Sequence, residues 1–198
     1  TGDDKVYNRN NVVMPNGSGL YGNDSDTQGF LIIPKPQSKR YYLITIDGTS
    51  GGRRGLHYSE IDMEMDNGYG DVDLSTKNTP LLDKFGVPID PFYDYPYGNA
   101  SEKLTSTVHC NGVDYWLVTQ INNDVYAYHV SQWGIATNPV VSPAPVPILN
   151  HGGENAIGAM KISRNTGRIG ICYGGDIMGY LAFGNFNNST GEVIFDPA

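Results

Sequence analysis

The sequence has few cysteines, few positive charges and no long apolar run, and each shortage argues against a class of protein. Two cysteines in 198 residues are too few for a disulfide framework, and the sequence leaves open whether Cys110 and Cys172 form a bridge. The 13 Lys and Arg against 21 Asp and Glu give a net charge of −8, which argues against nucleic acid as a partner. The longest strongly apolar run, Tyr41–Ile46, is short, so we expect no insertion into a membrane.

Motif spacings that carry common chemistry are also missing. Residues 48–52 match G-x-S-x-G, but a nucleophile elbow needs a helix after its serine, whereas residues 53–65 continue as a strand. We therefore interpret residues 48–52 as a hairpin loop, assign no catalytic residue, and expect no cofactor and no resident metal ion. No glycine-rich phosphate loop occurs, and no zinc-type spacing relates the four histidines, His57, His109, His129 and His151.

One acidic run is a weak candidate for a calcium site. Asp62, Glu64 and Asp66 alternate before Asn67 and Gly68, a pattern with some likeness to a calcium-binding loop. The glycine falls at the seventh position instead of the sixth, and no glutamate closes the loop. Alternate residues also form the solvent-facing side of a strand, which is the interpretation we prefer.

Glycine, proline and tyrosine are abundant, with 25, 12 and 14 residues, a composition typical of turn-rich all-β proteins. Phe30–Ile33 and Tyr41–Ile46 are short apolar runs joined by a Pro/Gln/Ser/Lys turn, which predicts a strand hairpin. The hairpin recurs 74 residues later, where Tyr115 aligns with Tyr41, and a third copy occupies residues 158–172. Repeats of about 50 residues that open with a strand pair are typical of β-propeller blades.

The repeat predicts an all-β chain of about three four-stranded antiparallel blades. Residues 15–19 are expected to form a turn and 56–65 a strand, and no segment holds the period of a helix. Propellers close with roughly four to eight blades, so we expect an incomplete portion of a larger ring, completed by the same or another chain. The predicted units are the end of a preceding blade at 1–26, a blade at 27–103 with an inserted loop at 83–100, and blades at 104–150 and 151–198.

The second hairpin supplies the residues to which we assign structural roles. Asn111 and Gly112 are expected as turn residues with positive φ. His109 precedes this turn, and we expect it to bond to the turn backbone. Tyr115 and Trp116 are expected to pack between blades, because large aromatic side chains bury the most area.

The inserted loop is the candidate binding element. It is rich in proline and aromatic residues, and long loops on a rigid scaffold often carry binding sites. We expect its ligand to be a protein or a glycan. The binding candidates are Phe92, Tyr93, Tyr95 and Tyr97.

Several ordered blocks carry a resemblance to a known family: VVMPNGSGLYGNDSDTQGFLIIPKP, YYLITIDGT, GLHYSEIDMEMDNGYGDVDLSTKNTPLL, EKLTSTVHCNGVDYWLVTQ, and NAIGAMKIS with FNNSTGEV. Together they cover most of residues 6–193. They resemble the N-terminal propeller region of large secreted proteins of gliding Bacteroidetes, which usually end in a type B sorting domain of the type IX secretion system. The sequence departs from that pattern in the insert at 83–100 and in lacking a sorting domain. The resemblance implies an extracellular, cell-surface setting and an adhesive or scaffolding role, and it carries over no catalytic residue.

The preferred hypothesis from the sequence is a non-enzymatic interaction or adhesion module that binds protein or glycan through its blade loops. One alternative is an enzyme that acts on polysaccharide at the mouth of the propeller. Others are a purely structural spacer and a virion component that borrowed such a module.

Overall fold

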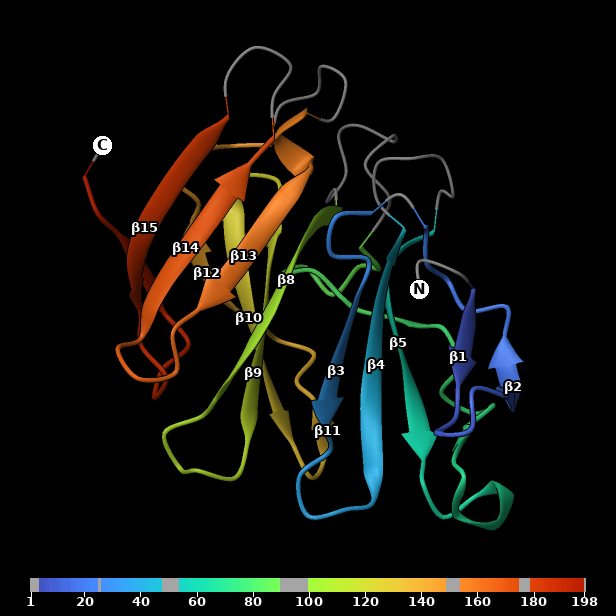
Figure 1. Cartoon of the computed structure of the whole chain (residues 1–198). Helices are drawn as coiled ribbons and strands as arrows, with labels where there is room; N and C mark the ends of the chain where they lie inside the picture. Colours follow the sequence, from blue (N-terminus) through green and yellow to red (C-terminus); the bar gives the residue numbers. More distant parts are fainter. Residues whose placement is uncertain are drawn as a thin grey trace.

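The computed structural model describes residues 4–24, 26–47, 54–89, 100–148, 154–174 and 179–197. Over these residues the chain is all-β, with four antiparallel sheets of two to five strands and two short 3-10 helices, η1 (Asp66–Gly68) and η2 (Glu154–Ala156) (Figure 1). The sheets do not close into a ring within the described part of the chain. None of the described residues belongs to a helix with the length and hydropathy of a membrane span.

The three larger sheets share one topology, in which four consecutive strands each lie antiparallel to the next. The first sheet contains β3 (Phe30–Pro34), β4 (Arg40–Asp47), β5 (Gly55–Asp62) and β6 (Asp71–Val72), with β7 (Thr79–Pro80) also paired to β5. The middle sheet contains β8 (Ala100–Val108), β9 (Tyr115–Ile121), β10 (Asp124–Ser131) and β11 (Gly134–Ile135), with β12 (Val140–Pro143) also paired to β10. The third sheet contains β13 (Gly158–Ile162), β14 (Arg168–Tyr173), β15 (Tyr180–Phe186) and β16 (Val193–Phe195).

A separate two-stranded sheet, the leading hairpin, is formed by β1 (Lys5–Tyr7) and β2 (Val13–Ser18). The turn expected at residues 15–19 is wrong, because β2 continues through Pro15 to Ser18. Proline is tolerated there since a two-stranded sheet consists of edge strands, where a missing N–H need not break a ladder. Asn16 is held from outside the hairpin, where its backbone N–H donates to Oδ1 of Asp71 at 2.8 Å.

The predicted hairpins are confirmed as antiparallel strand pairs, and two boundaries differ. The strand expected at 56–65 ends at Asp62, because Asp66 and Asn67 adopt positive φ values of 47° and 54° that a strand does not accept. The middle sheet begins at Ala100, inside the loop expected at 83–100. Ala100 pairs with Ile121, and an irregularity in register separates this pair from the rest of the β8–β9 ladder.

The sheets pack face to face, which explains the uninterrupted apolar run Trp116–Val118 in β9. Successive strand residues point to opposite faces of a sheet. Leu117 joins the core against the first sheet, with Ile44 of β4, whereas Trp116 joins the core against the third sheet, with Ile171 of β14. Both faces of the middle sheet are therefore buried.

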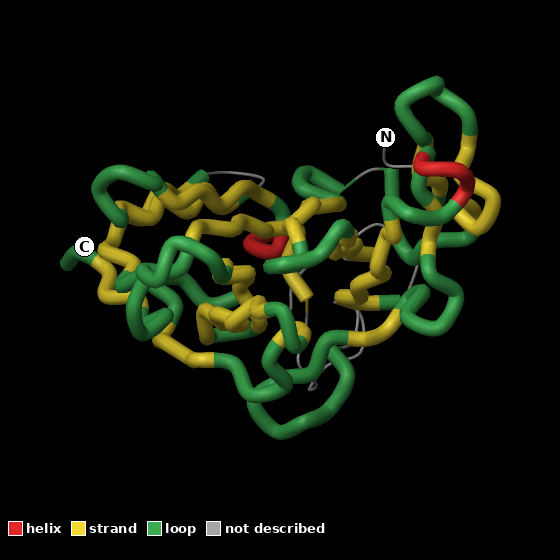
Figure 2. Tube along the Cα trace, turned by 90° about the horizontal axis from the view of Figure 1, so that it is seen from below, coloured by secondary structure: helices red, strands yellow, loops and turns green. Residues whose placement is uncertain are grey.

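The leading hairpin covers part of the remaining face of the first sheet. Met14 and Leu20 pack with Leu43, Ile61 and Val72 in a third core. Seen from below in Figure 2, the N-terminal and C-terminal ends of the described chain lie at opposite ends of the molecule.

The first strands of the three larger sheets lie next to one another, with β3 and β13 on either side of β8 (Figure 1). Gln28 links two of them, because its Oε1 accepts the backbone N–H groups of Leu104 at 3.3 Å and Met160 at 2.7 Å. Lys103 of β8 is fully buried here, and its Nζ donates to the carbonyl oxygens of Asn155 and Ala156. Desolvation lowers the pKa of Lys103 to about 7.

Candidate functional site

Two sequence-predicted elements fall outside the described residues. The binding candidates Phe92, Tyr93, Tyr95 and Tyr97 are among them, as is the G-x-S-x-G segment at 48–52. The described start of the insert, residues 83–89, closes a small loop with an isolated bridge between Leu82 and Pro88. Phe85 projects from this loop and is 77% exposed.

The calcium candidates lie at the end of β5 and in the turn after it, where two of the three contact cations. Asp62 is opposite Arg40 in the β4–β5 ladder and contacts its Nη2 at 2.7 Å. Glu64 contacts Nζ of Lys39 at 2.8 Å. Asp66 lies in the exposed turn of η1, and the three carboxylates do not gather into one cluster of close ligand atoms. This arrangement supports interpreting Asp62 and Glu64 as ion-pair partners.

The two cysteines are both exposed and free, so they form no bridge with each other. Cys172 lies on β14 of the third sheet. Cys110 lies in the β8–β9 turn, where its Sγ is 3.8 Å from Nδ1 of the neighbouring His109.

The β8–β9 turn contains the histidine contact that the sequence predicts. The backbone N–H of Asn111 donates to Nδ1 of His109 at 3.1 Å, and the backbone N–H of His109 donates to the carbonyl oxygen of Asp114 at 2.9 Å. Gly112 has a φ of 74°, as expected. The positive φ expected at Asn111 is wrong. Its side-chain Oδ1 instead accepts the N–H groups of Val113 and Asp114, which shapes the turn without a left-handed residue at 111.

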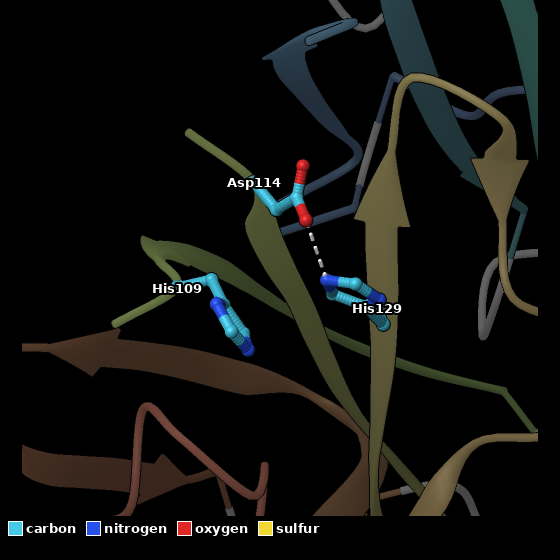
Figure 3. Close-up of side chains that lie close together, drawn as sticks. All are labelled: His109, Asp114 and His129. Atoms are coloured by element: carbon cyan, nitrogen blue, oxygen red, sulfur yellow. Dashed lines mark hydrogen bonds and ion pairs between the residues drawn. The ribbon is translucent and has the colours of Figure 1, made fainter. Parts of the chain in front are cut away.

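His109 and Asp114 flank this turn, and His129 of β10 joins them to form a cluster of three side chains. Their ligating atoms all lie within 4.8 Å of one another (Figure 3). Nε2 of His129 is 3.0 Å from Oδ2 of Asp114, and Nδ2 of Asn111 donates to the same oxygen at 2.9 Å. All three side chains are partly buried, so the cluster is reached from solvent.

Strand register explains why these residues meet. His129 of β10 is directly opposite Trp116 of β9, and Trp116 is opposite Thr107 of β8. Side chains two positions apart share a face, so His109 follows Thr107 and Asp114 precedes Trp116 on that face. It is the face of the middle sheet that packs against the third sheet.

Trp116 forms the wall behind the cluster. Its ring centroid is 5.5 Å from that of His109 and 5.3 Å from that of His129, and the two imidazoles are 4.9 Å apart. The indole is buried and packs edge-on against Phe186 of the third sheet. Tyr115, the other predicted packing aromatic, is partly buried against the core on the opposite face.

A polar groove of about 420 Å³ opens beside His109, between the turns of the middle and third sheets. Arg164 supplies a positive charge to it and Cys110 a free thiol. The groove is lined by Thr107, Val108, His109, Cys110, Arg164, Asn165 and Asn188.

The cluster is not predicted from the sequence, because its two histidines do not have a fixed spacing within one element. His109 and His129 come from different strands, and only the register of β9 with its two neighbours places them together. The lengths of the two hairpins could have indicated the cluster. His109 and Asp114 flank the first tight turn, and a second tight turn brings the strand that carries His129 back beside them.

Imidazole and carboxylate groups in this arrangement offer two kinds of chemistry. They are ligands for a first-row transition metal, and a histidine bonded to a carboxylate also forms the orienting half of a general base. A nucleophile hydrogen-bonded to the ring nitrogen of such a histidine is needed for the second use, and none is paired with His129 among the described contacts.

No protein-family model matches the chain, and no curated protein matches it.

Proposed function

We propose that this chain is a portion of a β-propeller that serves as a non-enzymatic interaction module of a secreted cell-surface protein. The observation that carries the proposal is the stack of three consecutive four-stranded meanders. They share strand order, they pack face to face, and their first strands lie side by side. Propeller blades are built in this way, with the first strand of each blade innermost.

The open face of the third sheet supports an incomplete ring. Leu181, Phe183 and Ile194 point away from the core and are 59%, 49% and 73% exposed. Cys172 and Gly170 lie opposite Leu181 and Phe183 in the ladder, so no charged side chain lies opposite these two residues on β14. Exposed apolar patches of this kind mark surfaces that pack against another element.

The first sheet presents a related face at the other end of the stack. Phe30 and Ile32 of β3 are about half exposed there. They border an apolar groove of about 330 Å³ between β3, β4 and the leading hairpin. Both end faces thus have the composition that further blades, from the same or another polypeptide, would cover.

We assign ligand binding to the loops, because the side chains of the strands pack against neighbouring sheets. The inserted loop remains the first candidate, with protein or glycan as the ligand. The sequence resemblance to secreted proteins of gliding Bacteroidetes supports an extracellular setting, and the exposed Phe85 supplies an aromatic contact at the described start of the loop.

The test is a binding assay on immobilised glycans and on a panel of extracellular proteins. Replacing residues 90–97 by a short Gly/Ser linker should abolish binding while the thermal unfolding midpoint is retained, because the buried Ile89 stays in place. The matched control is Trp133→Ser, which removes an exposed aromatic side chain from the β10–β11 turn. This turn lies at the opposite end of β10 from Asp124, whose carboxylate contacts Lys84 at the start of the insert. Equal binding by the loop variant and the parent would overturn the assignment to the insert. Sugars released from the glycans would overturn the non-enzymatic proposal.

A further inference from the structure

We propose that His109, Asp114 and His129 bind a divalent first-row transition metal ion of the Zn²⁺ class. Among the described residues they are the three ligating side chains that lie close enough together to share one ion. Two imidazole nitrogens and one carboxylate oxygen form a ligand set that zinc accepts, with a fourth position left for water or another ligand. The site is independent of the proposed propeller function.

The distances fit such an ion after a small adjustment. Zinc–nitrogen and zinc–oxygen bonds of about 2.0–2.2 Å place tetrahedral ligand atoms roughly 3.3–3.5 Å apart. Nε2 of His129 and Oδ2 of Asp114, at 3.0 Å, are already close to that separation. The widest separation within the cluster is no more than 4.8 Å, so rotation of the partly exposed His109 closes the site.

Each imidazole can offer a ring nitrogen to the ion once a local hydrogen bond is exchanged. Nδ1 of His109 accepts a backbone N–H from Asn111, so in the neutral ring this nitrogen is unprotonated. Metal binding at Nδ1 exchanges that hydrogen bond for a metal–nitrogen bond. Binding through Nε2 requires the neutral His129 ring with its proton on Nδ1, so the ion takes the place of the proton between Nε2 and Asp114.

The surroundings support the ligands as they do in metal sites. Nδ2 of Asn111 donates to Oδ2 of Asp114 at 2.9 Å and fixes the carboxylate, a contact of the kind that orients metal ligands. Trp116 packs behind both imidazoles and limits their movement. The polar groove shares His109, so a fourth ligand can reach the ion from the side of Arg164.

Two titrations of the metal-free protein test the site. Calorimetry with Zn²⁺ should show one equivalent bound. Fluorescence with Co²⁺ should show quenching of Trp116, because its ring lies against both histidines. The fluorescence experiment uses a Trp133→Phe background, since Trp133 is the other tryptophan and is 88% exposed.

Variants locate the ligands. Asp114→Asn and His129→Ala should each weaken Zn²⁺ binding by about tenfold or more, and thermal unfolding shows whether each variant is folded. Asp66→Asn removes a carboxylate from the exposed η1 turn, where asparagine accepts the positive φ, and should leave affinity unchanged.

Cys110→Ser separates the proposed site from binding by the neighbouring free thiol, and it should also retain affinity. Loss of binding in Cys110→Ser with retention in His129→Ala would overturn the proposal. Absence of heat and of quenching in the parent protein at millimolar metal would overturn it as well.

Discussion

The indole Nε1 of Trp116 donates a hydrogen bond of 2.9 Å to the backbone carbonyl oxygen of Asn188, 72 residues further along the chain. The same oxygen accepts the backbone N–H of Cys110 at 3.0 Å. One carbonyl of the β15–β16 turn thereby joins the third sheet to β9 and to the β8–β9 turn. The contact holds together the two sheets whose turns line the polar groove beside His109.

Gly191 is the residue that lets the β15–β16 turn approach Trp116. Its φ is 81°, and a Cβ at this position would lie 2.8 Å from the indole ring. Gly191→Ala is expected to lower the free energy of unfolding by about 2–4 kcal/mol, from left-handed strain and overpacking together. Urea unfolding measures the change.

Gly112→Ala is the control for Gly191→Ala, because Gly112 has a similar φ of 74° with no atom within 4 Å of the added Cβ. Gly112→Ala should lower the free energy of unfolding only by the strain of a left-handed alanine, about 1–2 kcal/mol. Equal losses in the two variants would show that the contact with Trp116 does not restrict residue 191.

Gln28 joins β8 to β13 through one amide oxygen, and its removal should loosen that contact. Gln28→Met keeps the length of the side chain but leaves the buried N–H groups of Leu104 and Met160 without their acceptor. A loss of about 2–4 kcal/mol is expected, since each orphaned group costs about 1–3 kcal/mol. Hydrogen exchange at these two amides should also accelerate. Gln28→Glu keeps an acceptor oxygen, and protection of both amides should survive in it. Unchanged exchange in Gln28→Met would contradict the bridging role.

Lys103 should make the free energy of unfolding depend on pH between its pKa in the folded chain and its pKa in the unfolded chain. Its pKa is lowered by burial to about 7, from 10.5 in the unfolded chain. In this window the unfolded state binds more protons, so the free energy of unfolding rises with pH, by at most about 1.4 kcal/mol per unit. Below pH 7 both states carry the proton, so the contribution of Lys103 to the free energy of unfolding no longer changes with pH and is at its lowest.

Urea unfolding of the parent and of Lys103→Met between pH 7 and pH 9 isolates this contribution, because the other titrating groups are common to both proteins. The variant should show the smaller slope. The range stops short of the tyrosines, since burial raises the pKa of Tyr42 and Tyr128 above the usual 10 and reverses the sign at higher pH. Parallel curves would contradict a buried lysine with a lowered pKa.

Arg40 is expected to stabilise the first sheet more than its neighbour Lys39. Its guanidinium contacts three carboxylates, those of Glu60 at 3.1 Å, Asp62 at 2.7 Å and Asp73 at 2.7 Å. The hydrogen bond that Arg40 donates to Asp73 is the main cause that raises the pKa of Arg40. Arg40→Met leaves those charges near one another and should cost roughly 1–2 kcal/mol, less at high salt.

Lys39→Met removes an exposed pair with Glu64 and should leave the free energy of unfolding nearly unchanged, because solvent screens the pair. Thermal unfolding at low and high salt compares the two variants. A larger loss in Lys39→Met than in Arg40→Met would contradict the network at Arg40.

The local fold could be predicted because it depends on neighbours in the sequence. The β-branched and aromatic run at Tyr41–Ile46 forms β4, and the proline and glycine signals between runs mark real turns. One failure came where a distant residue decided the outcome. Asn16, expected in a turn, is part of β2 and is bound by Asp71, 55 residues away.

The sequence by itself determined the strands, the all-β class and the repeat of the hairpin, since alternation, β-propensity and turn chemistry act over a few residues. Tertiary structure alone decided which charges and histidines meet. The register of β4 with β5 pairs Asp62 with Arg40, and that of β9 with β10 sets His129 opposite Trp116 and beside Asp114. Register depends on the packing of whole sheet faces, because a slip of one residue would turn every side chain of a strand to the other side.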